Sequence, residues 1–205
     1  MLDGNINGAE LKMWFEIGLA ASAVAGGLLW GAIKYLNSKR NKSDYFESHS
    51  RVYETLTELR VKADCARAQV VQFHNGEYFM DGISMRRKSL THESLNSAVV
   101  GEADKKQNLQ LSLFVPLMNM ITEDTCKLEI VSSHKDTYCK KFMESSDVVS
   151  FMALPLKTKN EITGYVMIQW CSLSKTDDII EEDCVKLLDK ARDIIGVQLS
   201  QQPKK

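Results

Sequence analysis

The sequence predicts an α+β fold: a central antiparallel sheet flanked by long first and last helices, behind a single apolar N-terminal helix. Two segments, Val148–Leu156 and Ile162–Cys171, are predicted to be the strands of a hairpin, separated by the polar residues 157–161. From residue 178 to residue 200, apolar residues recur at the three- to four-residue steps of an amphipathic helix. A strand hairpin between two helical segments favours an antiparallel sheet covered by helices.

The apolar N-terminal run is predicted to cross a membrane. The segment from Ile17 to Ile33 contains no charged residue and, as a helix, covers about 25 Å of a bilayer core of roughly 30 Å. We therefore expect a transmembrane helix over residues 14–36, after a short leader of residues 1–13. The alternative is a buried helix of a soluble protein. A cleaved signal peptide is disfavoured, because the leader carries Asp3 and Glu10 against Lys12 alone.

The charges that flank this run predict its orientation. Lys12 precedes it, whereas Lys34, Lys39, Arg40 and Lys42 follow it, and basic flanks stay on the cytoplasmic side of a membrane. The five cysteines include no C-x-x-C pair, which is typical of a chain in a reducing compartment. We expect a single-pass protein of the bacterial inner membrane with its C-terminal domain in the cytoplasm.

Small residues four positions apart predict close packing between copies of the membrane helix. A Gly-x-x-x-Gly spacing lets two helix backbones approach each other in a bilayer, although small residues are also common in single membrane helices. The small residues form two neighbouring rows: Gly18, Ser22 and Gly26, then Ala23, Gly27 and Gly31. We expect the lipid bilayer and further copies of the chain as partners, in a homo-oligomer.

The rest of the chain divides into four parts. A basic polar linker, residues 37–44, leads to an amphipathic connecting helix over residues 45–66. This helix is either a coiled-coil stalk or a helix that lies on its own domain. The α+β domain follows over residues 67–200, and a polar tail of residues 201–205 ends the chain.

Between residue 67 and the hairpin the pattern is mixed. Pro116 is expected to kink or break the apolar stretch around it, because proline removes a helical hydrogen bond. The expected elements are a strand over 68–73, turns at 74–76 and 81–82, a strand over 83–91, a helix opening at 92–94, a broken helix over 109–121, a strand over 126–132 and a short helix over 138–144.

Two motifs in this domain resemble a GAF-type domain. The hairpin Ala153–Leu156 and Ile162–Tyr165, followed by the terminal helix, is similar to the hairpin that precedes the closing helix in that family. The stretch Gln72–Gly76, with its Phe-His-Asn-Gly motif, resembles a variant of small membrane-anchored proteins of tailed bacteriophages. The layout also resembles the T-even phage type of holin, whose soluble domain lies outside the cytoplasm. The resemblance implies a GAF-like fold with a pocket, and a phage origin.

Two histidines are candidate pocket residues. His74 follows one predicted strand and His92 ends the next, so both can face a cavity of the sheet together with Asn75, Gly76 and Glu93. With Glu93 they could form a metal or acid–base cluster. In the alternative, Asn75 and Gly76 form a turn that needs positive φ angles, and His74 caps the strand. Because the usual metal-site spacings are absent, we expect no metal and favour pocket-lining roles.

Arg86 and Lys88 are candidate anion-binding residues. Strand alternation sends both side chains to one face and Arg87 to the other. If they face inward, they could hold a phosphate or a carboxylate. If they face outward, they form a solvated edge that resists aggregation or meets anionic lipids. A small anionic ligand or a regulatory protein is the expected partner of the domain.

Composition and motifs exclude several classes of function. Lys+Arg number 26 and Asp+Glu 27, for a net charge of -1, which is unlike a protein that coats nucleic acid. The chain contains no G-x-S-x-G, no P-loop and no G-x-G-x-x-G. The motifs that would distinguish the ligand classes of GAF domains, such as a cyclic-nucleotide signature or a chromophore-attachment cysteine, are also absent, so the resemblance implies no particular ligand. We expect neither catalytic activity nor a cofactor.

These observations predict a non-catalytic, membrane-anchored GAF-like protein that senses a ligand or acts as a scaffold. Binding of the ligand or partner is expected to be coupled to association in the membrane. The alternative is a holin-like lysis effector, whose anchor oligomerises while the soluble domain controls timing. A third possibility is a structural or interaction protein whose pocket is filled by side chains.

Overall fold

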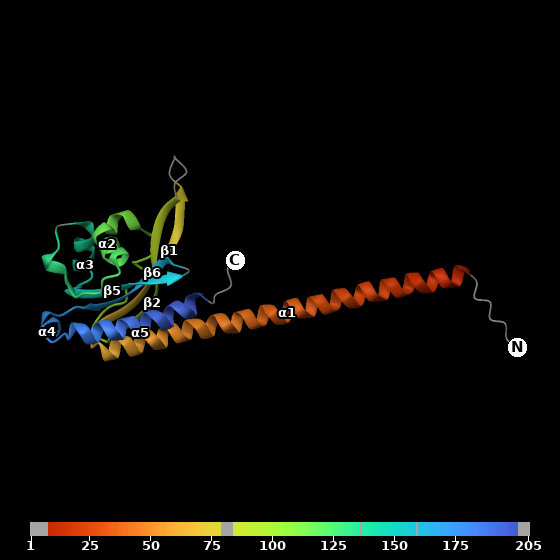
Figure 1. Ribbon diagram of the computed structural model, residues 1–205, viewed down its shortest axis with the longest axis horizontal. Helices are drawn as coiled ribbons and strands as arrows, with labels where there is room; N and C mark the ends of the chain where they lie inside the picture. The colour runs from red at the N-terminus through yellow and green to blue at the C-terminus, as the bar shows by residue number, and fades with distance from the viewer. Residues whose placement is uncertain (1–7, 79–83, 136, 159, 201–205) are drawn as a thin grey trace. The chain divides into compact units, whose positions relative to one another are not determined.

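The computed structural model describes residues 8–78, 84–135, 137–158 and 160–200, apart from some side chains, most of them between residues 8 and 43 (Figure 1). The elements in chain order are α1 (Gly8–Lys62), β1 (Arg67–Tyr78), β2 (Ser84–Leu95), β3 (Leu109–Gln110), η1 (Leu111–Phe114), α2 (Val115–Glu123), β4 (Glu129–Ile130), η2 (Val131–Ser133), α3 (Tyr138–Glu144), β5 (Ser150–Thr158), β6 (Glu161–Trp170), α4 (Leu173–Thr176) and α5 (Glu181–Ser200). The chain divides into two compact units, Met1–Phe46 and Glu47–Lys205.

In the first unit the described residues belong to α1. Within the part of the chain that the structure describes, no helix is both long enough and apolar enough to cross a membrane. The transmembrane helix expected over residues 14–36 is therefore not confirmed. Residues 37–44 are helical rather than a separate linker, because this segment contains neither Gly nor Pro and its Lys and Arg residues favour a helix.

The small-residue rows lie on this helix. Ser22, Gly26, Gly27 and Gly31 are exposed, and a Cβ atom added at any of the three glycines would meet no heavy atom within 4 Å. The side chain of Ser22 donates a hydrogen bond to the carbonyl of Leu19 at 2.8 Å. The side-chain surroundings of Gly18 and Ala23 lie outside the description. Packing between copies through these rows stays a prediction.

The second unit is built on a six-stranded antiparallel sheet in the order β3-β2-β1-β6-β5-β4. The predicted hairpin is confirmed: β5 and β6 pair from Ser150 and Trp170 to Thr158 and Glu161. β6 also pairs with β1, so the first and last long strands lie together in the centre of the sheet. Glycine is required at position 164, where β6 pairs with β1, since a Cβ atom there would lie 2.2 Å from the carbonyl oxygen of Val71.

β1 and β2 are longer than the sequence predicts. The turn expected at residues 74–76 and the helix expected to open at residues 92–94 are both wrong. Both segments belong to one long two-stranded arm, in which β1 pairs with β2. His74 lies opposite Arg87, and Val70 lies opposite His92. Cross-strand hydrogen bonds therefore override the local turn signal of Asn-Gly. The turn expected at residues 81–82 lies outside the described residues.

The shorter elements agree in part with the prediction. The helix over Tyr138–Glu144 is confirmed as α3. The stretch around Pro116 is broken into β3, η1 and α2, and the proline lies in the first turn of α2, where its missing N–H is tolerated. The strand expected over residues 126–132 is limited to Glu129–Ile130 and is followed by η2.

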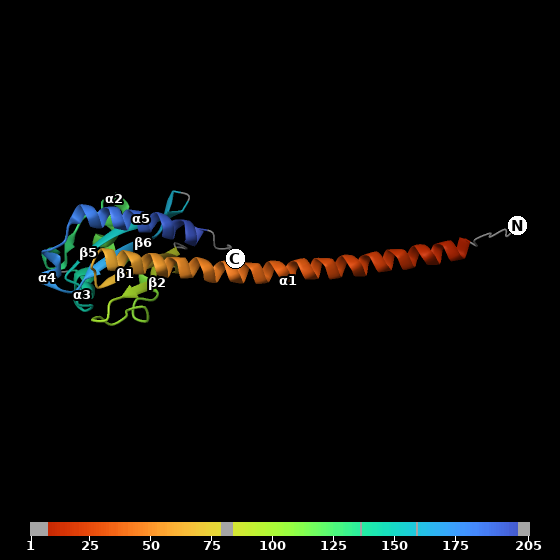
Figure 2. The same cartoon turned by 90° about the horizontal axis from the view of Figure 1, so that it is seen from below.

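Two layers cover the sheet, as the predicted α+β class requires. Residues 47–62 of α1 run beside α5 on one face (Figure 2), and both pack on alternate residues of the central strands. On the opposite face, η1, α2 and α3 enclose a second apolar cluster around Phe114, Tyr165 and Met143. The connecting helix expected over residues 45–66 thus ends at Lys62 and, from residue 47, lies on its own domain rather than forming a separate stalk.

Candidate functional site

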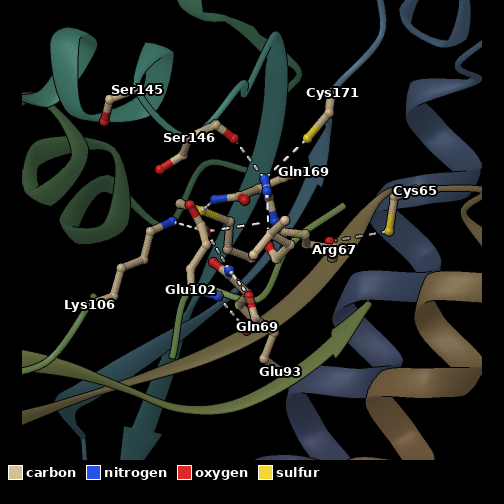
Figure 3. Close-up of polar contacts among 12 residues, drawn as sticks. Cys65, Arg67, Gln69, Glu93, Glu102, Lys106, Ser145, Ser146, Gln169 and Cys171 are labelled. Atoms are coloured by element: carbon tan, nitrogen blue, oxygen red, sulfur yellow. Dashed lines mark hydrogen bonds and ion pairs between the residues drawn. The ribbon is translucent and has the colours of Figure 1, made fainter. Parts of the chain in front are cut away.

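A cluster of buried polar side chains lies on the sheet face opposite α5 (Figure 3). We call it the polar cluster. Its members come from β1, β2, β6 and the loop between β2 and β3, residues 96–108, and they are Arg67, Gln69, Glu93, Glu102, Lys106 and Gln169. All except Glu93 are less than 9% exposed. Buried charges are unfavourable unless they are paired and hydrogen-bonded, so this arrangement needs specific partners.

Glu102 is the centre of these contacts. Its carboxylate forms an ion pair with the ammonium of Lys106 and accepts a hydrogen bond of 2.9 Å from Nε2 of Gln69. Gln69 also donates to Oε1 of Glu93 at 2.7 Å, and Oε2 of Glu93 accepts from the backbone N–H of Glu102 at 2.9 Å. Gln69 and Glu93, which face each other across β1 and β2, therefore attach the loop to the sheet.

Arg67 joins three further segments at the start of β1. Its Nη1 donates to the carbonyl of Ser146 at 2.9 Å and contacts Sγ of Cys171 at 3.1 Å. Its Nη2 donates to the carbonyl of Val100 at 3.2 Å, and its Nε lies 3.8 Å from the carboxylate of Glu102. One guanidinium thus connects the end of α3, the 96–108 loop and the end of β6.

Burial and mutual proximity shift the pKa values of Glu102 and Lys106. Burial by itself raises the pKa of Glu102, but the charge and hydrogen bond of Lys106 outweigh it and hold that pKa below its usual range. Burial lowers the pKa of Lys106, although the carboxylate of Glu102 acts in the opposite direction. Glu102 is therefore a charged hydrogen-bond acceptor at neutral pH rather than a proton donor.

A cleft of about 860 Å³ opens beside the polar cluster. Pockets for small molecules range from about 300 to 1,000 Å³, so the cleft has room for an organic ligand. Its walls combine apolar and polar groups from three sides, among them Val100, Lys105, Phe142, Ser146, Trp170 and Cys171. Arg67, Glu102 and Lys106 also line it, which makes the polar cluster part of its surface.

A second, much smaller cavity of about 10 Å³ lies between the sheet and α3. Lys88 reaches it from β2: its Nζ donates to the hydroxyl of Tyr165 at 3.1 Å and lies 3.3 Å from the centre of the Phe114 ring. Burial lowers the pKa of Lys88 to about 7 and raises that of Tyr165 above its usual range.

No protein-family model matches this chain, and no curated protein sequence matches it. Solved structures do. A GAF domain of Synechocystis sp. in its photoproduct state is 14% identical with a TM-score of 0.56, covering 75% of this chain and 94% of that one. A phycocyanobilin-bound GAF domain of a cyanobacterial phytochrome is 13% identical with a TM-score of 0.56, covering 79% and 94%.

A far-red-absorbing protein with bound biliverdin is 14% identical with a TM-score of 0.57, covering 80% of this chain and 97% of that one. The domain has a GAF-like fold. The predicted resemblance to GAF domains is thus confirmed for the fold, since this level of identity carries the fold alone. The expected likeness to phage membrane-anchored proteins and to holins stays a prediction, without support from these structures.

In this GAF-like fold four of the predicted residues of the β1–β2 arm, His74, Asn75, Gly76 and Arg86, line neither of the two cavities. His74, Asn75 and Arg86 are exposed. His74 lies on the face opposite Lys88 and shares a hydrogen bond of 2.9 Å with Ser89. Gly76 lies directly under the side chain of Arg87, which leaves no room for a Cβ atom. Of the predicted anion-binding pair, only Lys88 faces inward.

His92 faces α1 instead of the polar cluster. Its Nε2 lies 2.6 Å from Nδ1 of His49, and the two rings stack with centres 4.8 Å apart. The Thr91 hydroxyl donates to the carbonyl of Val70 at 3.3 Å, so it accepts from Nδ1 of His92 at 3.0 Å. Nε2 of His92 is then the acceptor and His49 the donor.

The predicted His74–His92–Glu93 cluster is not formed. Glu93 points to the polar cluster, whereas its neighbour His92 points to α1, because successive side chains of a strand alternate between faces. Among the described residues, no group of three or more His, Cys, Asp or Glu side chains could hold a metal ion.

Sequence reasoning missed most of the polar cluster. Glu102 and Lys106 lie in a loop without a pattern, and Arg67 begins a strand, so nothing local distinguishes them. The available signal was Gln69 and Gln169, two amides that lie among apolar residues in predicted strands. A buried amide requires hydrogen-bond partners, and that requirement points to a polar site.

We predict that Glu102→Gln lowers the free energy of unfolding by about 3 kcal/mol, because Arg67 and Lys106 would remain buried without a counter-charge. Urea denaturation followed by circular dichroism measures this change. Glu58→Gln is the matched control, since it removes an exposed carboxylate that pairs with Lys62 and should have little effect. Equal losses in the two variants would contradict the role of Glu102.

The His49–His92 contact predicts acid sensitivity. Burial lowers the pKa of His92 to about 4, whereas an unfolded histidine titrates near pH 6.5. The unfolded state therefore binds more protons below pH 6.5, and stability should fall by about 2 kcal/mol as the pH drops from 7 toward 4.5. Urea midpoints across this range test it. His92→Gln should remove most of the pH dependence, whereas His74→Gln, an exposed control, should retain it.

Proposed function

We propose that this domain is a regulatory module that binds a small organic molecule in the cleft beside the polar cluster. The observation that carries the proposal is the cleft itself: about 860 Å³, with the buried charges of Arg67, Glu102 and Lys106 on its surface. Buried charges are rarely kept without a use, since apolar residues pack there at lower cost. One similar structure is a GAF domain with bound phycocyanobilin and another is a far-red-absorbing protein with bound biliverdin, which supports the proposal that this fold binds a small molecule here as well.

The lining indicates the chemistry of the ligand. Phe142 and Val100 offer apolar surface to a ring or hydrocarbon portion. The ammonium of Lys105 is exposed in the cleft and can meet a carboxylate or phosphate of the ligand. We therefore propose a compact ligand with an apolar part and one anionic group. Since Glu102 and Arg67 are already paired, we propose binding without catalysis.

We propose that β2 relays binding from the cleft to α1. Glu93 holds the 96–108 loop at the cleft, and the next residue toward the N-terminus, His92, contacts His49 of α1. Between His92 and Leu90 the register of β1 and β2 shifts, so Thr91 forms a bulge. A bulge is a point at which a strand can bend locally. A ligand that moves the loop would thereby change the contact between β2 and the 47–62 part of α1.

We also propose that residues 14–36 attach the domain to a bacterial membrane. The uncharged run from Ile17 to Ile33 supports this proposal. So do the large apolar side chains Leu28, Leu29 and Trp30, which are more than 60% exposed in a single chain. Such surface is unfavourable in water and is expected to be covered by lipid or by another copy.

Ligand binding can be followed at the only tryptophan of the domain. The chain has 3 Trp residues, so Trp14→Phe with Trp30→Phe leaves Trp170, a buried core residue that is also among the residues lining the cleft. We predict a saturable change in Trp170 emission when the full chain is titrated with a panel of nucleotides, amino acids, organic acids and a filtered metabolite extract.

The control for this titration distinguishes the cleft from the surface. Val99→Arg places a long charged side chain at the cleft and should abolish the response. Val61→Arg makes the same change at an exposed position of α1 and should leave it intact. A metabolite extract that produces no change, or a response that survives Val99→Arg, would contradict binding in the cleft.

Membrane attachment is tested by fractionation. We predict that the full chain, expressed in bacteria, stays in the membrane pellet after alkaline carbonate and is released by detergent. Leu28→Asp with Leu29→Asp should shift it to the supernatant, because each buried charge opposes insertion by about 3 kcal/mol. Val100→Asp, at another exposed apolar position, is the control and should remain in the pellet. Release of the unaltered chain by carbonate alone would refute the attachment.

A further inference from the structure

The part of α1 that follows the uncharged run is strongly basic. The run from Ile17 to Ile33 ends directly before Lys34, and residues 34–42 contain no acidic residue. The basic residues of this short stretch, which we call the basic ring, are Lys34, Lys39, Arg40 and Lys42. A concentration of one sign of charge attracts a partner of the opposite charge.

The basic positions surround the helix axis rather than forming a stripe along it. Residues 34–42 are helical throughout, so each residue is rotated by about 100° from the one before it. Relative to Lys34, the positions of Lys39, Arg40 and Lys42 lie at about 140°, 240° and 80° around the axis. A helix that lies flat on a membrane would instead carry its basic residues on one side.

The apolar side chains before the basic ring also point to different sides of the helix. Leu28, Leu29 and Trp30 are consecutive, so they follow one another around the axis by about 100° each, and all three are more than 60% exposed. Ile33 and Leu36 are exposed as well. Apolar side chains on several sides, followed by basic residues on several sides, are typical of a helix that leaves a bilayer through its headgroup layer.

The dimensions of the basic ring suit that layer. From Lys34 to Lys42 the helix rises by about 12 Å, and the headgroup layer on each side of a bilayer is roughly 5–8 Å thick. Long basic side chains can also reach along the helix toward the headgroups. At the start of the ring, Nζ of Lys34 lies 5.3 Å from the centre of the Trp30 ring. Tryptophan is enriched where the hydrocarbon core meets the headgroups, so this pair indicates the depth at which the ring begins.

We propose that the basic ring binds the headgroups of anionic phospholipids and concentrates these lipids around α1. Arg40 can donate two parallel hydrogen bonds to one phosphate, and the lysines supply further ammonium donors. The phosphate of a zwitterionic lipid is already balanced by the cationic group of the same molecule, so the ring selects lipids of net negative charge. This inference rests on the proposed membrane attachment of residues 14–36 and adds the class of lipid. It does not depend on the cleft or its ligand.

Quenching of Trp30 by brominated lipids tests the proposal on the full chain. Trp14→Phe leaves Trp30 as the reporter, while Trp170 is buried in the domain and supplies a constant background. The protein is reconstituted into vesicles of phosphatidylcholine and phosphatidylglycerol, with bromine on the acyl chains of one lipid or the other. At equal mole fraction, brominated phosphatidylglycerol should quench Trp30 about twofold more strongly, because the ring enriches it locally.

The two ways of failing are distinct. Equal quenching by both lipids would refute the selection of anionic lipids and leave an acidic protein or nucleic acid as the partner of the ring. Quenching by neither lipid would refute the membrane attachment itself.

Variants assign the selection to the basic ring. Lys39→Gln, Arg40→Gln and Lys42→Gln together remove three charges but keep good helix formers, so the two lipids should then quench Trp30 equally. The matched control removes three exposed lysines of the second unit and should retain the difference: Lys62→Gln, Lys186→Gln and Lys190→Gln. A difference that survives the first triple variant would contradict the role of the ring.

Salt provides a second test that needs no substitution in the ring. Sodium chloride at about 1 M shortens the screening length to about 3 Å, so it should bring the two quenching values together. Should the triple variant be lost from the vesicles, this measurement decides the matter. A preference for phosphatidylglycerol that is unchanged by salt would refute charge as its cause.

Discussion

The antiparallel pairing of β1 with β6 is the contact on which the rest of the domain depends. It places the first strand after α1 beside the last strand before α5, so both helices cover one face of the sheet. On the other face it brings Arg67 and Gln69 of β1 next to Gln169 of β6. At the last pair, between Gln72 and Gly164, the two strands can approach only because glycine has no side chain. The carbonyl oxygen of Val71 occupies the space that a Cβ atom would need.

Burial of charge is the second constraint, and it distinguishes the two faces. The face covered by α1 and α5 is almost entirely apolar, apart from the His49–His92 contact and a few hydroxyls. The opposite face encloses Arg67, Glu102, Lys106 and Lys88, which a purely structural core would not need. This asymmetry is the physical reason why we propose ligand binding on one face and communication with α1 on the other.

β2 is the element that belongs to both faces. Its bulge at Thr91 changes the alternation of the strand, so Lys88 and Leu90 face inward before it and Glu93 faces inward after it. The same bulge turns His92 toward α1. A short segment of one strand therefore contacts the small cavity, the polar cluster and the helix. The 96–108 loop is attached to the same strand that contacts α1 through His92.

The sequence by itself determined the α+β class, the β5–β6 hairpin, α3 and the terminal helix, because each depends on neighbours a few residues apart. It did not determine the polar cluster, the side on which His92 lies, or the continuation of β1 through His74–Gly76. Those features depend on pairings between residues such as Arg67 and Ser146, or Gln69 and Glu102, that are distant in the chain. Local sequence patterns reflect interactions between residues that are close in the chain. A buried charge or the edge of a strand finds its partner only when the sheet has formed.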